Sequence, residues 1–231
     1  MYQKKRIIPY PIKDNIMEER MKKVFFAAVA VFVVSGSSAL YSQGLEAGSM
    51  KFGLYGGGGV NYVSGEAVGS PEAKAAGSYF FGVNGLYNIT DTGSLFVGLE
   101  YSYRPYKLES TGLFEYTSTI KAKFIDVNLG YRFTNFQGFY FEGGLFVGVP
   151  AGTWKYKGEG DLEGSGNCEN KDTKNEIGLM VGAGYLVPIA ETADLNIGVV
   201  MKKSFTKGYD DGFTKLKTQL FAVKAGVEMK F

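Results

Sequence analysis

Residues 221–231 read FAVKAGVEMKF and alternate strictly between two kinds of side chain. The odd-numbered positions, from Phe221 to Phe231, are all apolar, whereas the even-numbered positions hold small or charged residues that include Lys224 and Glu228. A period of two is typical of a β-strand whose two faces meet different surroundings. The segment therefore predicts a two-faced strand that runs to the last residue.

Seven further segments show the same alternation, at residues 50–62, 79–89, 95–103, 125–133, 139–149, 177–187 and 195–201. The expected strands have about 9–14 residues, longer than the ~5–6 residues that are common in soluble proteins. Their connections alternate between short ones, at 88–93, 134–138 and 189–194, and long ones, at 64–77, 108–115, 150–174 and 204–212. This order predicts an all-β, antiparallel, up-and-down meander of eight strands with every long connection at one end.

Eight up-and-down strands form either a soluble barrel with an apolar interior or a transmembrane barrel with an apolar exterior. Three features favour the transmembrane β-barrel. The less apolar face is rich in glycine, which suits a crowded lumen better than a solvated surface. Aromatic residues such as Tyr79, Tyr103 and Phe133 cluster near strand ends, as in the girdles at two membrane interfaces. The third feature is Phe231, which closes an alternating strand.

The first 42 residues are expected to lie outside this fold. Basic residues follow Met21, an unbroken apolar run of 11 residues extends from Val24 to Val34, and small residues come next, as in a cleaved signal peptide. The run is short for a membrane-spanning helix, which needs about 20 apolar residues. We therefore predict a signal peptide at 21–42 and a barrel domain at 46–231. Our hypothesis for residues 1–20 is an upstream extension that is not translated.

Composition excludes several kinds of functional site. Residues 1–42 hold seven of the 25 basic and three of the 23 acidic residues, so residues 43–231 carry 18 basic and 20 acidic residues. This balance indicates no basic patch for nucleic acid. The absence of histidine excludes histidine-based catalysis and ligation, and the single Cys168 excludes an internal disulfide or a cysteine-cluster metal site. The sequence predicts no catalytic site, no cofactor and no metal.

The signal peptide, the amphipathic strands and stretches such as FIDVNLGYRF (124–133) and YFEGGLFVGV (140–149) resemble the small eight-stranded bacterial outer-membrane β-barrels of the OmpX, OmpW and OmpA-domain kind. The resemblance covers residues 46–231 and implies a location in the outer membrane of a diderm bacterium, beside lipid and lipopolysaccharide or an equivalent. It also implies that the barrel-assembly machinery recognises the last strand. That signal would comprise Phe221, Val223, Val227, Met229 and Phe231.

Ten charged residues are expected to point into the barrel, five of each sign: Lys51, Glu100, Arg104, Asp126, Arg132, Glu142, Glu176, Lys202, Lys224 and Glu228. We expect a neutral plug of ion pairs, since unpaired charges would be costly there. Carboxylates that act as acid and base are the alternative. Arg132 and Glu142 should face each other across a short turn, and Lys51 and Glu228 should do so across the first and last strands.

Five aromatic residues are also expected to face inward: Tyr55, Phe80, Phe96, Tyr140 and Phe146. Each ring is expected to cover a glycine on a neighbouring strand. The alternative is that the rings line a narrow pocket for a small hydrophobic ligand. The glycine run at 56–59 is expected to bend a strand rather than bind phosphate, because no helix follows it.

Two classes of function remain open. The favoured one is a non-enzymatic integral outer-membrane protein that contributes to envelope structure, surface interaction or passage of a small apolar solute. The other is an outer-membrane lipid-modifying enzyme or protease without a histidine-based site. The connection from Pro150 to Lys174, which holds Trp154 and Cys168, is the candidate contact surface for a ligand. Its acidic residues at 159–163 lack the spacing of a known calcium loop.

Overall fold

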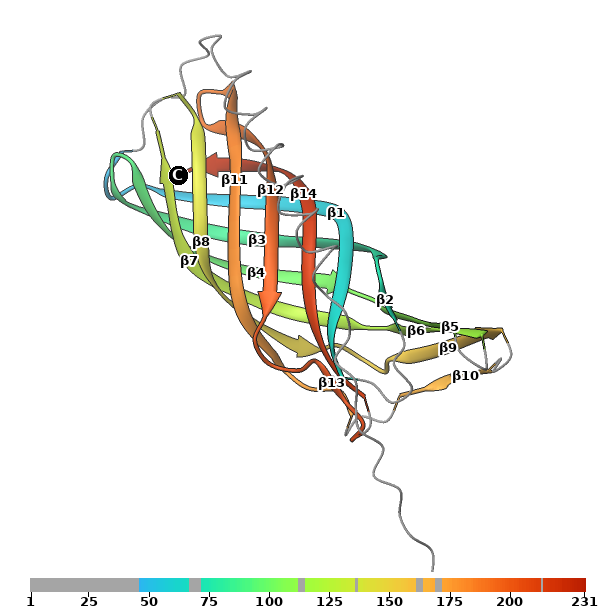
Figure 1. Cartoon of the computed structure of the whole chain (residues 1–231). Coiled ribbons are helices and arrows are strands. Elements are labelled where there is room, and N and C mark those ends of the chain that lie inside the picture. The colour runs from blue at the N-terminus through green and yellow to red at the C-terminus, as the bar shows by residue number, and fades with distance from the viewer. Residues whose placement is uncertain are drawn as a thin grey trace, which may run out of the picture.

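Eight long antiparallel strands close into a barrel in the computed structural model (Figure 1). They are β1 (Met50–Glu66), β3 (Ala76–Thr90), β4 (Gly93–Tyr103), β7 (Lys123–Thr134), β8 (Phe139–Pro150), β11 (Glu176–Ala190), β12 (Ala193–Ser204) and β14 (Lys215–Lys230). Each pairs with the next along the chain, and β14 pairs with β1 to close the barrel. This confirms the predicted all-β, up-and-down barrel.

The structure describes residues 46–66, 72–111, 115–135, 137–160, 164–168, 172–212 and 214–231. The expected extension at 1–20 and the expected signal peptide at 21–42 lie outside these residues. In the described ranges, no helix is long and apolar enough to cross a membrane.

The strands are strongly tilted against the barrel axis. Following the paired residues once around the barrel from Phe139 leads back to the same strand at Val149, ten residues further along β8. Such a stagger requires strand tilts of about 35–45°. The line of paired residues therefore climbs along the axis as it passes from β1 through β3 and β4 to β7.

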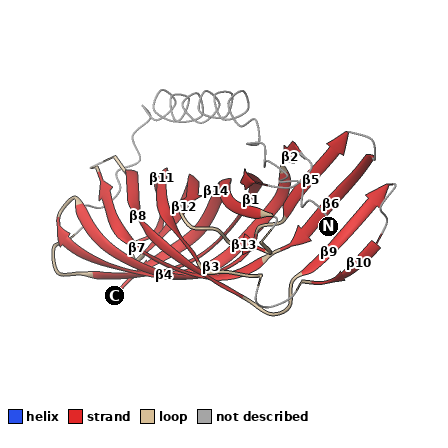
Figure 2. Cartoon of the chain, turned by 60° about the horizontal axis from the view of Figure 1, so that its bottom comes forward, coloured by secondary structure: helices blue, strands red, loops and turns tan. Residues whose placement is uncertain are grey.

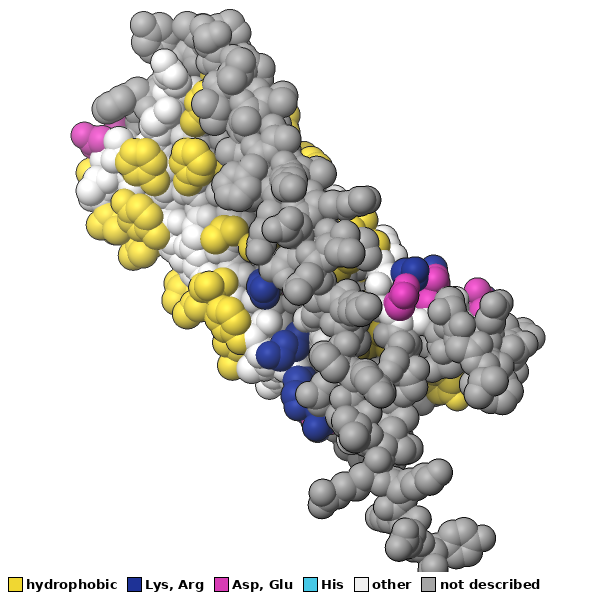
Figure 3. All heavy atoms as spheres, viewed as in Figure 1, with side chains coloured by type: hydrophobic (Ala, Val, Ile, Leu, Met, Phe, Trp, Pro, Cys, Tyr) yellow, Lys and Arg dark blue, Asp and Glu magenta, His cyan; other side chains and the backbone are white. Residues whose placement is uncertain are grey.

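The two faces of each strand separate as the alternation predicts. Outward side chains are apolar and exposed, and Figure 3 shows them spread over the visible part of the barrel wall. Val127 and Leu129 on β7 are 46% and 59% exposed, whereas the intervening Asn128 is 3% exposed. Large exposed apolar belts are unfavourable in water, so this surface is suited to lipid.

One end of the barrel carries the short connections and both Met50 and Phe231, whose backbones are joined by a hydrogen bond of 3.1 Å. We call it the turn end. At the opposite end a second sheet projects beyond the barrel (Figures 1 and 2). This sheet, which we call the arm, has the order β10-β9-β6-β5-β2. Its strands are β2 (Glu72–Lys74), β5 (Tyr106–Thr111), β6 (Glu115–Lys121), β9 (Lys155–Gly160) and β10 (Gly164–Asn167).

The arm is a continuation of the barrel wall. β5 follows β4 after Arg104 and Pro105, and β6 leads into β7 through Ala122 alone. The prediction of long loops at 108–115 and 150–174 is therefore wrong, because most of the described residues in these segments form strands. They were missed because the outward side chains of the arm, such as Lys107 and Glu109, are charged. Beyond a membrane an outward face has no need to be apolar.

The inward face of the arm base packs into a core of its own at the mouth of the barrel. Its members are Val63, Tyr106, Leu108, Ile120, Ala122, Phe124, Trp154, Cys168, Tyr209 and Leu216. Tyr209 lies in the short strand β13 (Tyr209–Asp210), which pairs with β14. Trp154 is 0% exposed and packs edge-on against Phe124, with ring centroids 5.0 Å apart. This mouth core covers the barrel at the arm end.

Candidate functional site: the barrel lumen

The inside of the barrel holds the charged residues that the sequence placed there. All ten expected inward side chains are buried, and Asp194 on β12 joins them. Successive side chains on a strand point to opposite faces, so the residues between the outward apolar ones point into the barrel. The lumen is therefore a charged interior enclosed by an apolar wall.

Near the turn end, a cluster is centred on Arg132. Its Nε and Nη2 donate to Oε2 of Glu142 at 3.1 and 2.9 Å, and its Nη1 donates to Oε1 of Glu228 at 2.6 Å. Lys224 forms a second ion pair with Glu142. Arg132 and Glu142 are directly opposite each other on β7 and β8, as expected across their short turn. Fork-shaped pairing of this kind fixes geometry as well as charge.

The expected pair of Lys51 with Glu228 is wrong. Lys51 donates to Asp194 at 2.7 Å, while Glu228 accepts from Arg132 and from Asn196. In the register of β1 with β14, Lys51 is opposite Lys230, and Gly53 is opposite Glu228. The long lysine side chain reaches across to β12 instead. Sequence reasoning missed Asp194 because it assigned that residue to a short turn.

A second cluster lies nearer the arm end. Lys202 donates to Glu100 at 2.7 Å and to Asp126 at 3.0 Å. Arg104 forms ion pairs with Asp126 at 2.7 Å and with Glu176 at 3.1 Å. The guanidinium carbon of Arg104 also lies 4.2 Å from the ring centre of Phe124, in the mouth core. Arg104 directly follows β4 and Asp126 belongs to the neighbouring strand β7, whereas the pairs of Lys202 with Glu100 and of Arg104 with Glu176 cross the lumen between strands that are not neighbours.

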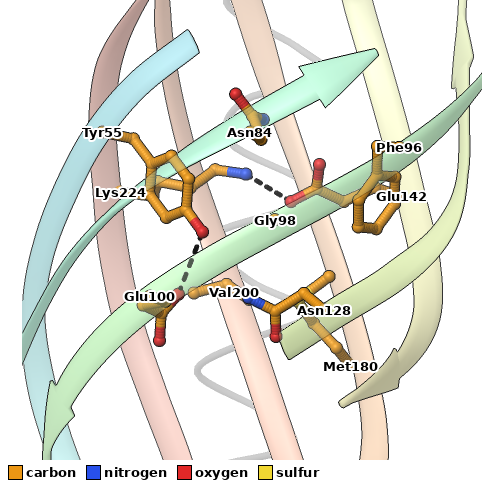
Figure 4. A pocket seen from close by; sticks show the side chains of 10 residues that line it. All are labelled: Tyr55, Asn84, Phe96, Gly98, Glu100, Asn128, Glu142, Met180, Val200 and Lys224. Atoms are coloured by element: carbon orange, nitrogen blue, oxygen red, sulfur yellow. Dashed lines mark hydrogen bonds and ion pairs between the residues drawn. The ribbon is translucent and has the colours of Figure 1, made fainter. Parts of the chain in front are cut away.

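Between the two clusters lies a small cavity, whose lining includes Tyr55, Asn84 and Asn128 (Figure 4). Its volume is about 20 Å³, which is room for one water molecule. The Oδ1 atoms of Asn84 and Asn128 are buried without a protein partner among the described residues. A water molecule would suit this polar site, whereas an apolar ligand would need far more space.

Four of the five inward aromatic rings cover glycines on neighbouring strands, which confirms that prediction for them. A Cβ atom on Gly57 would collide with the Phe80 ring, and one on Gly178 would collide with Phe146. Phe96 lies in the same way over Gly130, and Tyr140 over Gly184 and Gly198, whereas the Tyr55 ring covers no described glycine of a neighbouring strand and only its hydroxyl approaches Gly98. The rings and glycines thus interlock, and the narrow hydrophobic pocket that was the alternative is filled by protein.

The candidate contact surface from Pro150 to Lys174 is partly internal. Trp154 is buried and donates through Nε1 to the backbone oxygen of Lys123 at 3.1 Å. Cys168 is buried beside it, and burial raises the pKa of the Cys168 thiol, with Asp172 and Asp211 adding to the shift. Both residues stabilise the mouth core and are unsuited to contact a partner directly.

The described residues contain no cluster of three or more potential metal ligands. Glu159 forms an ion pair with Lys157 at 2.5 Å, and hydrogen bonding to Lys157 lowers the pKa of the Glu159 carboxyl. The other two acids expected near it, Asp161 and Glu163, lie outside the described residues. The structure therefore describes only one of the three acids at 159–163.

The five residues of the expected assembly signal lie on the outward side of the last strand: Phe221, Val223, Val227, Met229 and Phe231. Val223 is 57% exposed and Phe231 is 82% exposed. They form an apolar stripe that leads to the turn end.

Comparison with known proteins gives a single family. The family model described as "Outer membrane protein beta-barrel domain" matches residues 25–231. No curated protein matches the chain. Among solved structures, the chain is similar to Ail, the attachment invasion locus protein of Yersinia pestis, at 15% identity over 80% of this chain and 100% of that one, with a TM-score of 0.43. It is also similar to Neisserial surface protein A, at 16% identity over 78% and 97% of the two chains, with a TM-score of 0.41.

Proposed function

The chain belongs to the family of outer membrane protein β-barrel domains, and we propose that it acts in the outer membrane without enzymatic activity, as a closed anchor that presents the arm at the cell surface. The observation that carries this proposal is the continuation of the barrel wall into a five-stranded sheet. Bacterial outer-membrane barrels keep short turns on the periplasmic side and longer connections outside. The arm would then stand outside the cell.

The arm is built to hold a fixed shape. Its strands β5 and β6 run directly from and into the barrel strands β4 and β7, with a backbone hydrogen bond from Arg104 to Ala122 between the two sheets, and its base is anchored by the buried Trp154 and Tyr106, whose ring centroids are 5.7 Å apart. Its outward face carries mixed charges, with ion pairs such as Lys74–Glu109 at 3.4 Å and Lys107–Glu109 at 3.1 Å. A rigid, polar surface of this kind supports contact with a partner at the cell surface better than a flexible loop does.

The plugged lumen argues against passage of a solute. Buried ion pairs cross the barrel at two levels, the cavity between them has a volume of about 20 Å³, and the mouth core covers the arm end. The alternative enzyme class has no support from the geometry. The buried carboxylates are engaged by Lys or Arg.

Solute passage provides the first test. Planar bilayers that contain the refolded protein should show no stepwise current. Intact cells that express the chain should take up a small apolar solute such as naphthalene no faster than cells that lack it. A general porin incorporated in the same way serves as the positive control. Steady conductance, or faster uptake, would contradict the closed anchor.

Surface presentation provides the second test. In a Cys168→Ser background, a cysteine at Lys157 on β9 should react with a membrane-impermeant maleimide on intact cells. A cysteine at Thr192, in a short turn at the opposite end, should react only after permeabilisation. The reverse pattern would refute the orientation. Trypsin added to intact cells should spare the lysines within β5, β6 and β9, because their backbone is held in the ladder; rapid cleavage there would refute a rigid arm.

A further inference from the structure

A groove interrupts the apolar outer wall of the barrel at β1, β3, β4 and β14. Its volume is about 650 Å³. The floor is formed where Gly56 on β1 lies between Phe81 on β3 and Ala225 on β14. Leu54, Tyr101 and Val227 are among the residues that line it. Because Gly56 and Ala225 have almost no side chain, the wall is recessed at a depth where its neighbours project into lipid.

Two pairs of aromatic side chains on β3 and β4 lie on the outer wall, one at the groove and one on its arm side. Phe81 and Tyr101 have ring centroids 5.1 Å apart, with 30° between their planes. Tyr79 and Tyr103, one outward position further along the same two strands, are stacked with centroids 5.1 Å apart. Tyrosines at this position are typical of the membrane interface, where the ring is in the apolar layer and the hydroxyl meets polar groups.

One lysine adjoins the Tyr79–Tyr103 pair, and two more lie beyond it on the arm side. Lys123 on β7 is paired in register with Tyr103 on β4. Lys121 on β6 is directly opposite Lys155 on β9. Like charges placed directly opposite each other destabilise a sheet. In the part of the chain that the structure describes, no carboxylate forms an ion pair with any of these three ammonium groups. This arrangement is suited to an anion from outside the protein.

The lysines and the groove are separated by about the length of one lipid leaflet. The line of paired residues from Gly56 crosses three strand spacings to Ile125, and Lys123 lies two residues further towards the arm end. With the usual strand spacing, rise and tilt, this path climbs about 15 Å along the barrel axis. The hydrocarbon core of a bilayer is about 30 Å thick, so this height equals about the thickness of one leaflet.

We propose that this wall binds a phosphorylated glycolipid of the outer leaflet, with a phosphate among Lys121, Lys123 and Lys155 and one acyl chain in the groove over Gly56. A phosphate supplies the anion that the three lysines lack, through charge-assisted hydrogen bonds. A flexible hydrocarbon chain fills a recess that is already within the apolar layer. The lysines lie towards the arm end, so in the orientation of the proposed function, on which this assignment rests, the lipid belongs to the outer leaflet.

Lipid retention tests the proposal directly. The refolded full chain would be incubated in mixed micelles with bisphosphorylated lipid A, with dephosphorylated lipid A or with dimyristoyl phosphatidylglycerol, and bound lipid counted by native mass spectrometry. Lipid A with its phosphates should be retained, and the dephosphorylated form should be lost. Equal retention of both forms would overturn the role of the phosphate. Stronger retention of phosphatidylglycerol would overturn the assignment to a glycolipid.

Matched variants distinguish binding at this site from nonspecific attraction of lipid A to positive charge. Lys123→Gln with Lys155→Gln should weaken retention about tenfold, as expected for loss of a charge-assisted contact. Lys215→Gln with Lys217→Gln removes the same charge from β14 and should leave retention unchanged. Equal losses in the two pairs would mean that any surface charge suffices and would refute the site.

The groove needs its own control. Gly56→Val fills the recess and should also reduce retention of lipid A. Gly143→Val places the same side chain on an outward-facing glycine of β8, where the nearest atom to an added Cβ is 3.9 Å away, and should have no effect. Heat-dependent gel migration identifies the variants that are folded. Normal retention by folded Gly56→Val would refute the acyl-chain site.

Discussion

Arg132 on β7 donates to Glu228 on β14 at 2.6 Å, although three other strands separate β7 from β14 in the sheet. The pair therefore crosses the lumen and joins two walls of the barrel. Both side chains are nearly completely buried, and Glu142 shares the same guanidinium. A buried pair is costly to break because the remaining partner keeps its charge in a poorly solvated place.

Arg132→Met should therefore destabilise the barrel by about 3–5 kcal/mol. Adding Glu228→Gln should cost less than the sum of the two single changes, because the second change removes a charge that has already lost its partner. Urea unfolding in lipid vesicles measures both effects. Lys217→Met, at a partly exposed outward position, is the control and should stay within about 0.5 kcal/mol of the wild type. Strict additivity would show that the pair does not interact.

Two adjacent glycines on β1 test the interlocking of rings and glycines. Gly57 faces inward, where an added Cβ would collide with Phe80, whereas Gly58 faces outward, with no atom nearer than 3.7 Å. Gly57→Ala should cost about 1–3 kcal/mol through overpacking. Gly58→Ala should be neutral or stabilising by about 0.4–1 kcal/mol, because alanine reduces the entropy of the unfolded chain. Equal unfolding midpoints for the two variants would contradict the inward and outward assignment.

The thiol of Cys168 should lose its proton at a higher pH in the folded protein than in the unfolded chain. Burial, together with Asp172 and Asp211, raises its pKa, so the reactive thiolate forms at higher pH in the folded protein than in the unfolded chain. The rate of alkylation by iodoacetamide, followed against pH, should therefore have its midpoint above the one measured in urea. Asp172→Asn should move the folded midpoint down. A midpoint that is the same with and without urea would contradict the buried position.

The same shift has a consequence for stability. The unfolded chain gives up its thiol proton first, so unfolding releases a proton once the pH exceeds the usual thiol value of about 8.5. The contribution of Cys168 is fully present below that pH and declines above it. Cys168→Ser should flatten this part of the stability profile, although Tyr209, whose pKa is also raised by burial, adds its own decline at higher pH.

Phe231 should act in delivery rather than in stability. Its side chain is 82% exposed, and its only hydrogen bond among the described residues is made by the backbone to Met50. Phe231→Ala keeps that bond, so the unfolding midpoint in detergent should hardly change. The amount of barrel in the outer membrane should fall severalfold if the assembly machinery reads this residue. Normal membrane levels would show that Phe231 is no assembly signal here.

The eight barrel strands were predictable because lipid and lumen impose opposite demands on alternate residues. Residues 125–133 alternate between apolar and polar or small side chains at every position, and this segment lies within β7. The arm was missed because no membrane surrounds it. A weaker signal was present: Tyr106 and Leu108 alternate with Lys107 and Glu109, with the apolar residues on the side that continues the lumen.

The burial of the lumen charges could be predicted because they alternate with the apolar outward residues of each strand. Most of their ion-pair partners could not be predicted. Arg132 and Glu142 flank a short turn, so their pairing follows from local register. Lys51 pairs with Asp194, which is 143 residues away, and the choice depends on the shape of the closed lumen. Side chains that reach across a barrel are not constrained by the register of adjacent strands.

The cross-lumen pairs also shape how this chain folds. Lys202 and Glu100 are 102 residues apart, and Arg132 and Glu228 are 96 apart. Neither pair can form until the middle and last thirds of the chain have met. Before closure, Lys202 and Glu228 lack these cross-lumen partners, so partly closed sheets are disfavoured relative to the closed barrel. High contact order of this kind makes folding slow. The charge network that plugs the barrel thus makes closure an all-or-none event.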